Sequence, residues 1–464
     1  MGSEGRRWVS LAVCLTASFM SLLDANIVNV ALPSIETGLG ATQAHLQWIV
    51  AGYSLALGLV LIPSGRIGDI YGRRTMFIVG VGIFTAGSIL AGFATSAGAL
   101  VLARLFQGVG GGVLNPQVSG IIQDLFRGRA RGRAFGLLGT VIAVSSAIGP
   151  LVGGLILQAA PGPQGWRWVF FVNAPIGITA MLLAIRLLPE GRRRRNADRG
   201  QDPWGILLLG LATLAMLFPL VQLRQLATPV LTLLFVLGAM FAAAFLLWEQ
   251  RLARRGGPVL LDLALFRLPG YGVGVLLAFL FFVGSTGFIF TLTLYLQNGL
   301  GHSPLVAGVI LSPLAIGAAV ASPIGGTAVH RFGNRVVLTG FAAILLGLAG
   351  IASLLTADIT AAGEWRLALF LLIVGVGNGL VVSPNQVQTL SNVPGWRAGI
   401  GGAVITTGQR VGAALGVAIT GSVYFTMLST GAGQGRAVLV GMSTTLIAAS
   451  LALTIGTITA RRRP

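Results

Sequence analysis

One acidic side chain, Asp24, lies in an apolar run that covers residues 8–32. A run of this length is long enough to cross a lipid bilayer as a helix. A carboxylate at that depth is costly, so an ionisable residue inside a membrane helix is by default a functional-site hypothesis. Because a carboxyl group can bind and release a proton, Asp24 is a candidate proton carrier.

Arg104 is the candidate partner of this carboxylate, because it lies near the start of another apolar run, residues 98–122. If the two runs cross the membrane in opposite directions, both residues lie about 10 Å below the outer surface, at a rise of about 1.5 Å per residue. Movement of Arg104 towards or away from Asp24 would then switch the proton affinity of the carboxyl group. The alternative is a permanent structural ion pair, since a lone buried charge would be costlier.

The other charged residues have weaker claims to this chemistry. Asp124 stands at the end of its apolar run, where it could cap a helix, pair with Arg127–Arg133 or carry a proton. Asp358 and Glu364 are expected in an outer loop, and the last six apolar runs contain no carboxylate. Arg410 does lie in such a run, where it would favour an anionic or neutral compound or serve only as a buried structural residue.

The elements that position these residues are predicted to be membrane-spanning helices. The chain has 464 residues, of which 55% are hydrophobic and only 9% charged, whereas a soluble domain has about 25% charged residues. Each span needs about 20 apolar residues, so we predict an all-α polytopic membrane protein with 14 transmembrane helices. The predicted spans cover residues 8–32, 46–66, 75–95, 98–122, 133–158, 168–188, 204–223, 229–248, 270–297, 304–328, 336–356, 365–388, 398–427 and 437–459.

The basic residues indicate topology. All 31 Lys and Arg positions are Arg, and the formal net charge is +19. Clusters in alternate loops follow the positive-inside rule, which predicts a multi-pass protein of the cell membrane with both termini in the cytoplasm and argues against a nucleic-acid partner. The clusters are Arg6–Arg7, Arg73–Arg74, Arg127–Arg133, Arg192–Arg195, Arg251–Arg255, Arg331–Arg335 and Arg461–Arg463, and single arginines such as Arg224 lie between them.

Several function classes are excluded by what the chain lacks. Without Lys it has no P-loop, so uphill transport would need an ion gradient or a partner ATPase. Its single cysteine, Cys14, allows no disulfide within the chain and suggests no metal site. We find no metal cluster and no nucleophile with a neighbouring base, so neither an enzyme nor a cofactor is predicted.

An internal repeat indicates how the spans are grouped. Residues 65–74 read GRIGDIYGRR and residues 326–335 read GTAVHRFGNR, so that Asp69 corresponds to His330. Internal repeats of this kind build many transporter folds. With the charged interruptions at residues 189–203 and 250–269, the repeat predicts a six-helix bundle over residues 1–188, two extra helices over 189–269, and a second six-helix bundle over 270–464.

Several segments in order give the chain a family resemblance: LLDANIVNVALPSI (22–35), QWIVAGYSLALGLVLIPSGRIGDIYGRR (47–74), RLFQGVGGG (104–112), AIGPLVGG (147–154), WRWVFFVNAPIG (166–177) and YLQNGLGHSPLVAG (295–308). On these motifs the chain resembles the major facilitator superfamily, and within it the fourteen-spanner drug:proton antiporter branch. The resemblance covers nearly the whole chain and implies the major facilitator fold.

The resemblance also implies roles for two groups of residues. A cytoplasmic loop motif would lock one gate state; its residues are Gly65, Asp69, Gly72, Arg73 and Arg74. An antiporter motif in the fifth span would mark exporters and seal the leak path, its residues being Gly149, Pro150, Gly153 and Gly154. The alternatives are a tight charged turn that only sets topology, and a glycine-rich face for helix packing.

Polar residues in spans should face the bundle interior, and the counterparts of these spans line the family's cavity. The predicted substrate-cavity residues are Asn26, Asn29, Tyr53, Gln107, Asn115, Tyr295, Asn378, Gln386 and Arg410. The Phe-rich stretch over residues 279–290 is expected to be core or lipid-facing rather than a ligand box.

These observations together predict a monomeric, proton-coupled antiporter that exports amphiphilic small molecules such as drugs or antibiotics by alternating access. One alternative is an exporter of lipids, cell-envelope components or secondary metabolites from the same branch. Another is a proton-coupled importer, against which the glycine–proline motif of the fifth span argues.

Overall fold

The computed structural model describes residues 3–190, 202–221, 226–302, 304–356, 364–431 and 433–461, and every regular element in these ranges is helical. Thirteen of the helices searched there are long and apolar enough to cross a membrane. The predicted span over residues 204–223 is present as a shorter apolar helix, Pro203–Pro219. The all-α, multi-pass prediction is therefore confirmed, whereas Arg192–Arg195, Arg224 and Asp358 lie outside the described residues.

The chain forms two compact units, and two helices contribute to both of them. The first unit contains Met1–Leu125, Val152–Leu268 and Val393–Thr407, and the second contains Phe126–Leu151, Pro269–Asn392 and Gly408–Pro464. The chain crosses from one unit to the other within α5 (Gly128–Ala159) and within α14 (Ala398–Ser429).

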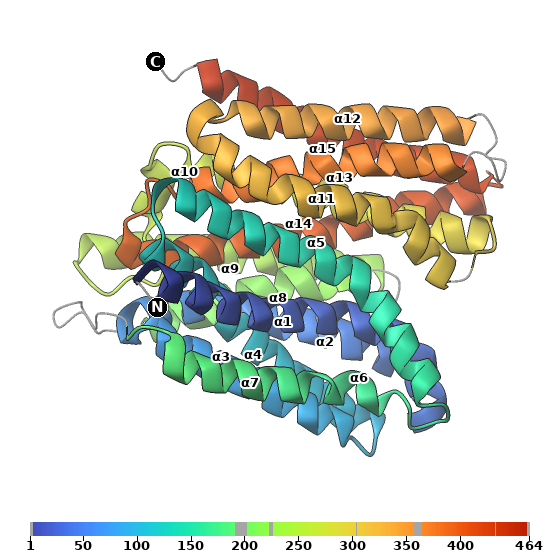
Figure 1. Ribbon diagram of the computed structural model, residues 1–464, viewed down its shortest axis with the longest axis horizontal. Helices are drawn as coiled ribbons and strands as arrows, with labels where there is room; N and C mark the ends of the chain where they lie inside the picture. The colour runs from blue at the N-terminus through green and yellow to red at the C-terminus, as the bar shows by residue number, and fades with distance from the viewer. Residues whose placement is uncertain are drawn as a thin grey trace. The chain divides into compact units, whose positions relative to one another are not determined.

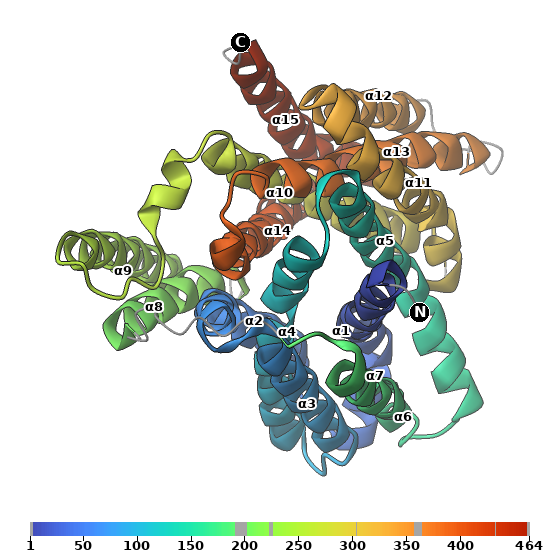
Figure 2. The same cartoon turned by 60° about the vertical axis from the view of Figure 1, so that its left-hand side comes forward.

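The first unit contains the N-terminal helices and the two inserted ones. Its elements are α1 (Ser3–Leu39), α2 (Gln43–Tyr71), α3 (Arg73–Gly92), α4 (Ala97–Leu125), α6 (Arg167–Phe171), α7 (Asn173–Leu187), α8 (Pro203–Val221), α9 (Thr228–Arg254), η1 (Leu263–Arg267) and η4 (Gly395–Arg397). The inserted helices α8 and α9 pack against each other, and α8 also packs on α2 (Figure 2).

Glycines allow α4 to lie close to α2 on one side and to α3 on the other (Figure 1). A Cβ atom at Gly108 would lie 2.4 Å from the carbonyl oxygen of Tyr53 on α2, and one at Gly87 of α3 would lie 2.7 Å from the Cα of Gln107. Small residues of this kind let membrane helices approach backbone to backbone. The tight packing leaves the polar side chains of Arg104, Gln107 and Gln117 on α4 buried.

The second unit contains α10 (Tyr271–Leu294), η2 (Tyr295–Gly299), α11 (Pro304–Phe332), α12 (Arg335–Thr356), α13 (Glu364–Thr389) and α15 (Gln434–Arg461), together with parts of α5 and α14. Its core contains Phe281, Phe288 and Phe341. The Phe-rich stretch of α10 thus contributes to the core, as the sequence led us to expect.

The two copies of the internal repeat make corresponding helix contacts. A Cβ at Gly65 of α2 would lie 2.9 Å from the carbonyl oxygen of Gly399 in α14, and one at Gly326 of α11 would lie 2.2 Å from that of Gly132 in α5. Both turns that follow use a glycine with positive φ, +108° at Gly72 and +56° at Gly333. The repeat is therefore present in the structure as well as in the sequence.

Candidate functional site

Asp24 is completely buried and forms an ion pair with Arg104. The distance from Arg104 Nη1 to Asp24 Oδ2 is 2.6 Å, and the side chain of Arg104 is 1% exposed. The two residues come from α1 and α4, and they are 80 residues apart in the chain. The meeting that the sequence predicted is therefore present in the structure.

Three further groups hold the guanidinium of Arg104. Its Nε donates to the carbonyl oxygen of Ile49 at 3.1 Å, and its Nη1 also donates to Oε1 of Gln107 at 2.7 Å. The ring of Tyr53 lies beneath the guanidinium, 4.3 Å from its central carbon. Because these partners are neutral, they would keep Arg104 in place even when the charge on Asp24 is removed.

Two amides donate to the other oxygen of the carboxylate. Asp24 Oδ1 accepts from Gln107 Nε2 at 2.9 Å and from Asn173 Nδ2 at 2.7 Å. Asn173 is the first residue of α7, and its Nδ2 also donates to Ser88 Oγ on α3 at 3.0 Å. Asp24 thus connects α1 directly to α4 and α7, and through Asn173 to α3.

The structure adds two observations to the sequence-based picture of this site. Gln107 and Tyr53, which were predicted to line the substrate cavity, are buried around the ion pair. Asn173 was missed, although it lies in a motif already noted for the family resemblance. The available signal was an amide within an apolar span, which should be buried and hydrogen-bonded rather than exposed to lipid.

Asn173 has one unsatisfied group. Its side chain is fully buried, and among the described residues no donor reaches its Oδ1. A buried polar atom without a partner is uncommon in native structures. If the side-chain amide of Asn173 rotated by about 180°, this Oδ1 could accept a hydrogen bond from the O–H of a protonated Asp24.

We expect Asn173→Leu to lower the melting temperature of the protein in detergent. Leucine keeps approximately the size of the side chain but removes the donor to the carboxylate of Asp24 and the donor to Ser88 Oγ. A hydrogen bond to a charged group contributes about 1.5–3 kcal/mol, so the melting temperature should fall by about 3–6 °C. Asn392→Leu, at an exposed position, is the control; an unchanged melting temperature for Asn173→Leu would contradict the prediction.

The loop motif forms a second charged cluster, at the junction of α2 and α3. Asp69 accepts from both Nε and Nη2 of Arg73, at 3.1 and 2.7 Å. The same carboxylate accepts from the backbone N–H groups of Gly399 and Ile400, each at 3.1 Å. These donors belong to the first turn of α14, where unpaired N–H groups and the helix dipole favour an anion.

Arg73 extends this cluster to α4. Its Nη1 donates to the carbonyl oxygen of Gly120 and pairs with Asp124 Oδ2, both at 2.6 Å. Arg74 points elsewhere and pairs with the exposed Glu190 at 3.0 Å. The sequence offered Arg127–Arg133 as partners of Asp124, whereas the structure pairs it with Arg73.

The glycines of the fifth-span motif have different environments. A Cβ at Gly153 would lie 3.0 Å from Cγ1 of Ile27, which is one turn beyond Asp24 on α1, whereas a Cβ at Gly154 would have no atom within 4 Å among the described residues. Pro150 lies inside α5, next to the point where that helix passes between the two units.

We expect the two neighbouring glycines to respond differently to the same substitution. Gly153→Leu would push α5 away from α1 beside the ion pair, and export should fall at least about tenfold, the effect of roughly 1.4 kcal/mol. Gly154→Leu adds a side chain where there is space and should retain most of the activity. Export per molecule of inserted protein is the measurement, and equal losses in both variants would contradict this assignment.

The remaining predicted cavity residues are distributed over both units. Asn26, Asn29 and Asn115 each donate to a carbonyl oxygen of their own helix. Tyr295, Asn378 and Gln386 are buried, and Arg410 is half-buried.

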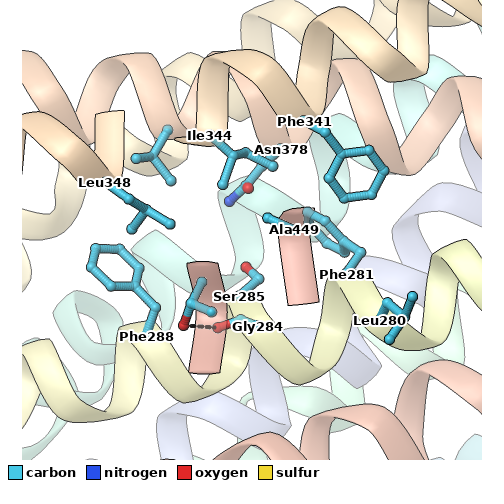
Figure 3. A pocket seen from close by; sticks show the side chains of 12 residues that line it. Leu280, Phe281, Gly284, Ser285, Phe288, Phe341, Ile344, Leu348, Asn378 and Ala449 are labelled. Atoms are coloured by element: carbon cyan, nitrogen blue, oxygen red, sulfur yellow. Dashed lines mark hydrogen bonds between the residues drawn. The ribbon is translucent and has the colours of Figure 1, made fainter. Parts of the chain in front are cut away.

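Asn378 lines a small cavity together with Phe281, Phe288 and Phe341 (Figure 3). The cavity holds about 10 Å³, which is about the space of one water molecule. It is therefore too small to receive a drug-sized compound.

The comparisons agree with this architecture. The sequence matches the Major Facilitator Superfamily over residues 14–417. The chain belongs to this superfamily. It is 36% identical over 432 residues to a probable actinorhodin transporter of Streptomyces coelicolor, covering 92% of this chain and 74% of that protein.

A second relative is the puromycin resistance protein pur8 of Streptomyces alboniger, 36% identical over 436 residues, covering 93% of this chain and 83% of that one. The crystal structure of the human organic anion transporter MFSD10 (TETRAN) superposes with a TM-score of 0.69 at 16% identity, covering 97% of this chain and 99% of that one. This major facilitator member is thus a membrane transporter with drug- and antibiotic-related homologues, and it is not an enzyme.

Proposed function

We propose that this major facilitator protein is a proton-coupled antiporter that exports amphiphilic small molecules, antibiotics among them, from the cell. The observation that carries the proposal is Asp24, a fully buried carboxylate in a candidate membrane span whose two oxygens are held by one arginine and two amides. Two relatives, a probable actinorhodin transporter and a puromycin resistance protein, support the direction of transport.

The chemistry of this cluster supports proton coupling. When Asp24 binds a proton, it loses its charge, and its ion pair with Arg104 becomes a weaker hydrogen bond from the charged guanidinium to a neutral carboxyl group. Arg104 keeps Ile49, Gln107 and Tyr53 as partners. Protonation therefore mainly weakens the contacts that the Asp24 carboxylate makes from α1, including the hydrogen bond from Asn173 on α7. An arrangement of the helices that depends less on these contacts is then favoured when the proton is bound.

Alternating access supplies the rest of the cycle. Asp24 takes a proton in the state open to the outside, the cavity closes on that side and opens inwards, and the proton is released to the cytoplasm before substrate binds. The cluster of Asp69, Arg73 and the first turn of α14 would hold one gate state through the contacts described above. Loss of these contacts would permit the other state.

We propose a six-helix bundle over residues 1–188, two extra helices over residues 189–269 and a second six-helix bundle over residues 270–464. Of the residues proposed to contact substrate, Asn26, Asn29 and Asn115 belong to the first bundle, and Tyr295, Asn378, Gln386 and Arg410 belong to the second. We propose a monomer in the cell membrane with both termini in the cytoplasm, as the arginine distribution indicates.

Transport into proteoliposomes by the purified protein tests the proposal. With an imposed pH and voltage difference, puromycin should accumulate against its gradient, and a protonophore should abolish that accumulation. Acidification that follows drug addition would show exchange of drug for protons. Accumulation that survives the protonophore would overturn proton coupling, and uptake in the opposite direction would favour an importer.

A further inference from the structure

A cleft in the first unit lies outside the transport machinery described above. It runs between the C-terminal turns of α9 and the short helix η1, and has a volume of about 490 Å³. Ligand sites of small molecules have volumes of about 300–1,000 Å³. The cleft therefore has room for a polar group the size of a phospholipid headgroup.

Buried hydrogen bonds fix the walls of this cleft. Glu249 on α9 is 1% exposed and accepts from the backbone N–H groups of Leu260 and Leu261, at 3.1 and 3.3 Å. Asp202, just before α8, accepts from Trp248 Nε1 at 2.9 Å. The segment between α9 and η1 is thus attached to the end of α9, and the end of α9 is attached to the start of α8.

Two carboxylates and two arginines line the cleft, and they differ in how far they are already paired. Its acidic residues have partners: Glu249 has the two N–H groups, and Asp262 caps η1 through the N–H of Ala264 and forms an ion pair with Arg397. Its basic residues are Arg254 and Arg267. Both are exposed, and in the part of the chain that the structure describes neither has an ion-pair or hydrogen-bond partner.

The surroundings of the cleft favour a lipid over a soluble anion. The apolar stretch of α9 is a candidate membrane span with only 11% of its residues buried. Leu246, Leu247 and Phe266 are exposed near the cleft, and so is Trp204 at the start of α8. An anionic headgroup at the arginines would place its acyl chains beside this apolar surface, at the end of the span where headgroups lie.

We propose that this cleft binds the phosphate headgroup of an anionic phospholipid, with Arg254 and Arg267 as its ligands and the acyl chains along the exposed face of α9. Arginine suits this role because its planar fork can donate two hydrogen bonds to one phosphate. In this proposal the inserted helices α8 and α9 attach the first unit to anionic lipid. The proposal does not depend on proton coupling.

Native mass spectrometry of the purified full-length protein, titrated with phosphatidylglycerol or phosphatidylcholine, tests this site. We expect phosphatidylglycerol to bind more tightly than phosphatidylcholine. The double variant Arg254→Gln with Arg267→Gln should bind phosphatidylglycerol about 30-fold more weakly, since each arginine near a charged surface contributes roughly tenfold or less. The matched control is Arg251→Gln with Arg255→Gln, which removes the same charge from exposed arginines of the same region that do not line the cleft. This control should bind phosphatidylglycerol almost as the wild type does.

Three outcomes would overturn the proposal: equal weakening by the two double variants, equal binding of the two lipids, or displacement of phosphatidylglycerol by millimolar inorganic phosphate. The first would show diffuse surface attraction, and the last a site for a soluble anion. If the double variant does not fold, Arg254→Lys with Arg267→Lys replaces it. That variant keeps the charge but loses the planar fork, and we expect weakening of about three- to tenfold; unchanged binding would overturn the assignment of the arginine pair as phosphate ligands.

Discussion

Asp24→Asn should abolish uphill export while leaving the protein folded. Asparagine keeps the shape of the side chain and can still form hydrogen bonds with Gln107 and Asn173, but it cannot bind and release a proton. At about 150 mV, one net charge supplies roughly 3.5 kcal/mol, enough for about a 350-fold gradient. We expect the accumulation ratio to fall from a value of that order to about one.

The measurement is the steady-state accumulation of puromycin in energised proteoliposomes, compared at equal amounts of inserted protein. Glu36→Gln is a suitable control, because it removes a carboxylate from the same helix at an exposed position. That variant should export as the wild type does. If Asp24→Asn still builds a gradient that the protonophore collapses, another group carries the proton, and the proposed mechanism fails.

The sequence was most informative for features that depend only on residues close together in the chain. Membrane spans can be located from hydropathy alone, because a span must be apolar along its whole length, and the placement of arginines between spans indicates their orientation. The meeting of Asp24 and Arg104 also followed from such an argument, since equal depth in oppositely directed helices follows from the helical rise. Their separation of 2.6 Å shows that this geometry was sufficient.

Other features depend on tertiary packing and could not be obtained in this way. Asn173 is 149 residues from Asp24, and no spacing rule connects them. Gln107 was within reach of prediction, because residues three apart on a helix share a face, and it follows Arg104 by three. The cleft beside α9 is lined by residues from 249 to 267, and Asp202 ahead of α8 is hydrogen-bonded to the neighbouring Trp248, so the surroundings of the cleft depend on how α8 and α9 pack together.

Arg104→Leu should strongly destabilise the folded protein. Removing one partner of a buried ion pair leaves an uncompensated charge, a loss of about 3–5 kcal/mol. Gln107 and Ile49 would also lose the donor that satisfies them. For a protein of this size we expect the melting temperature in detergent to fall by about 5–10 °C.

The decisive comparison is the double variant Asp24→Asn with Arg104→Leu, which removes both charges at once. If the penalty comes from the unpaired carboxylate, the double variant should recover at least half of the loss in melting temperature, although it cannot transport uphill. Arg366→Leu is the control, because Arg366 is exposed at the start of α13 and should change the melting temperature by about 1 °C or less. A double variant less stable than Arg104→Leu would show that the arginine acts through its packing on Tyr53 and its bonds to neutral groups. The charge of Asp24 would then contribute little to the packing of the helices. Protonation of Asp24 would therefore have little effect on their arrangement.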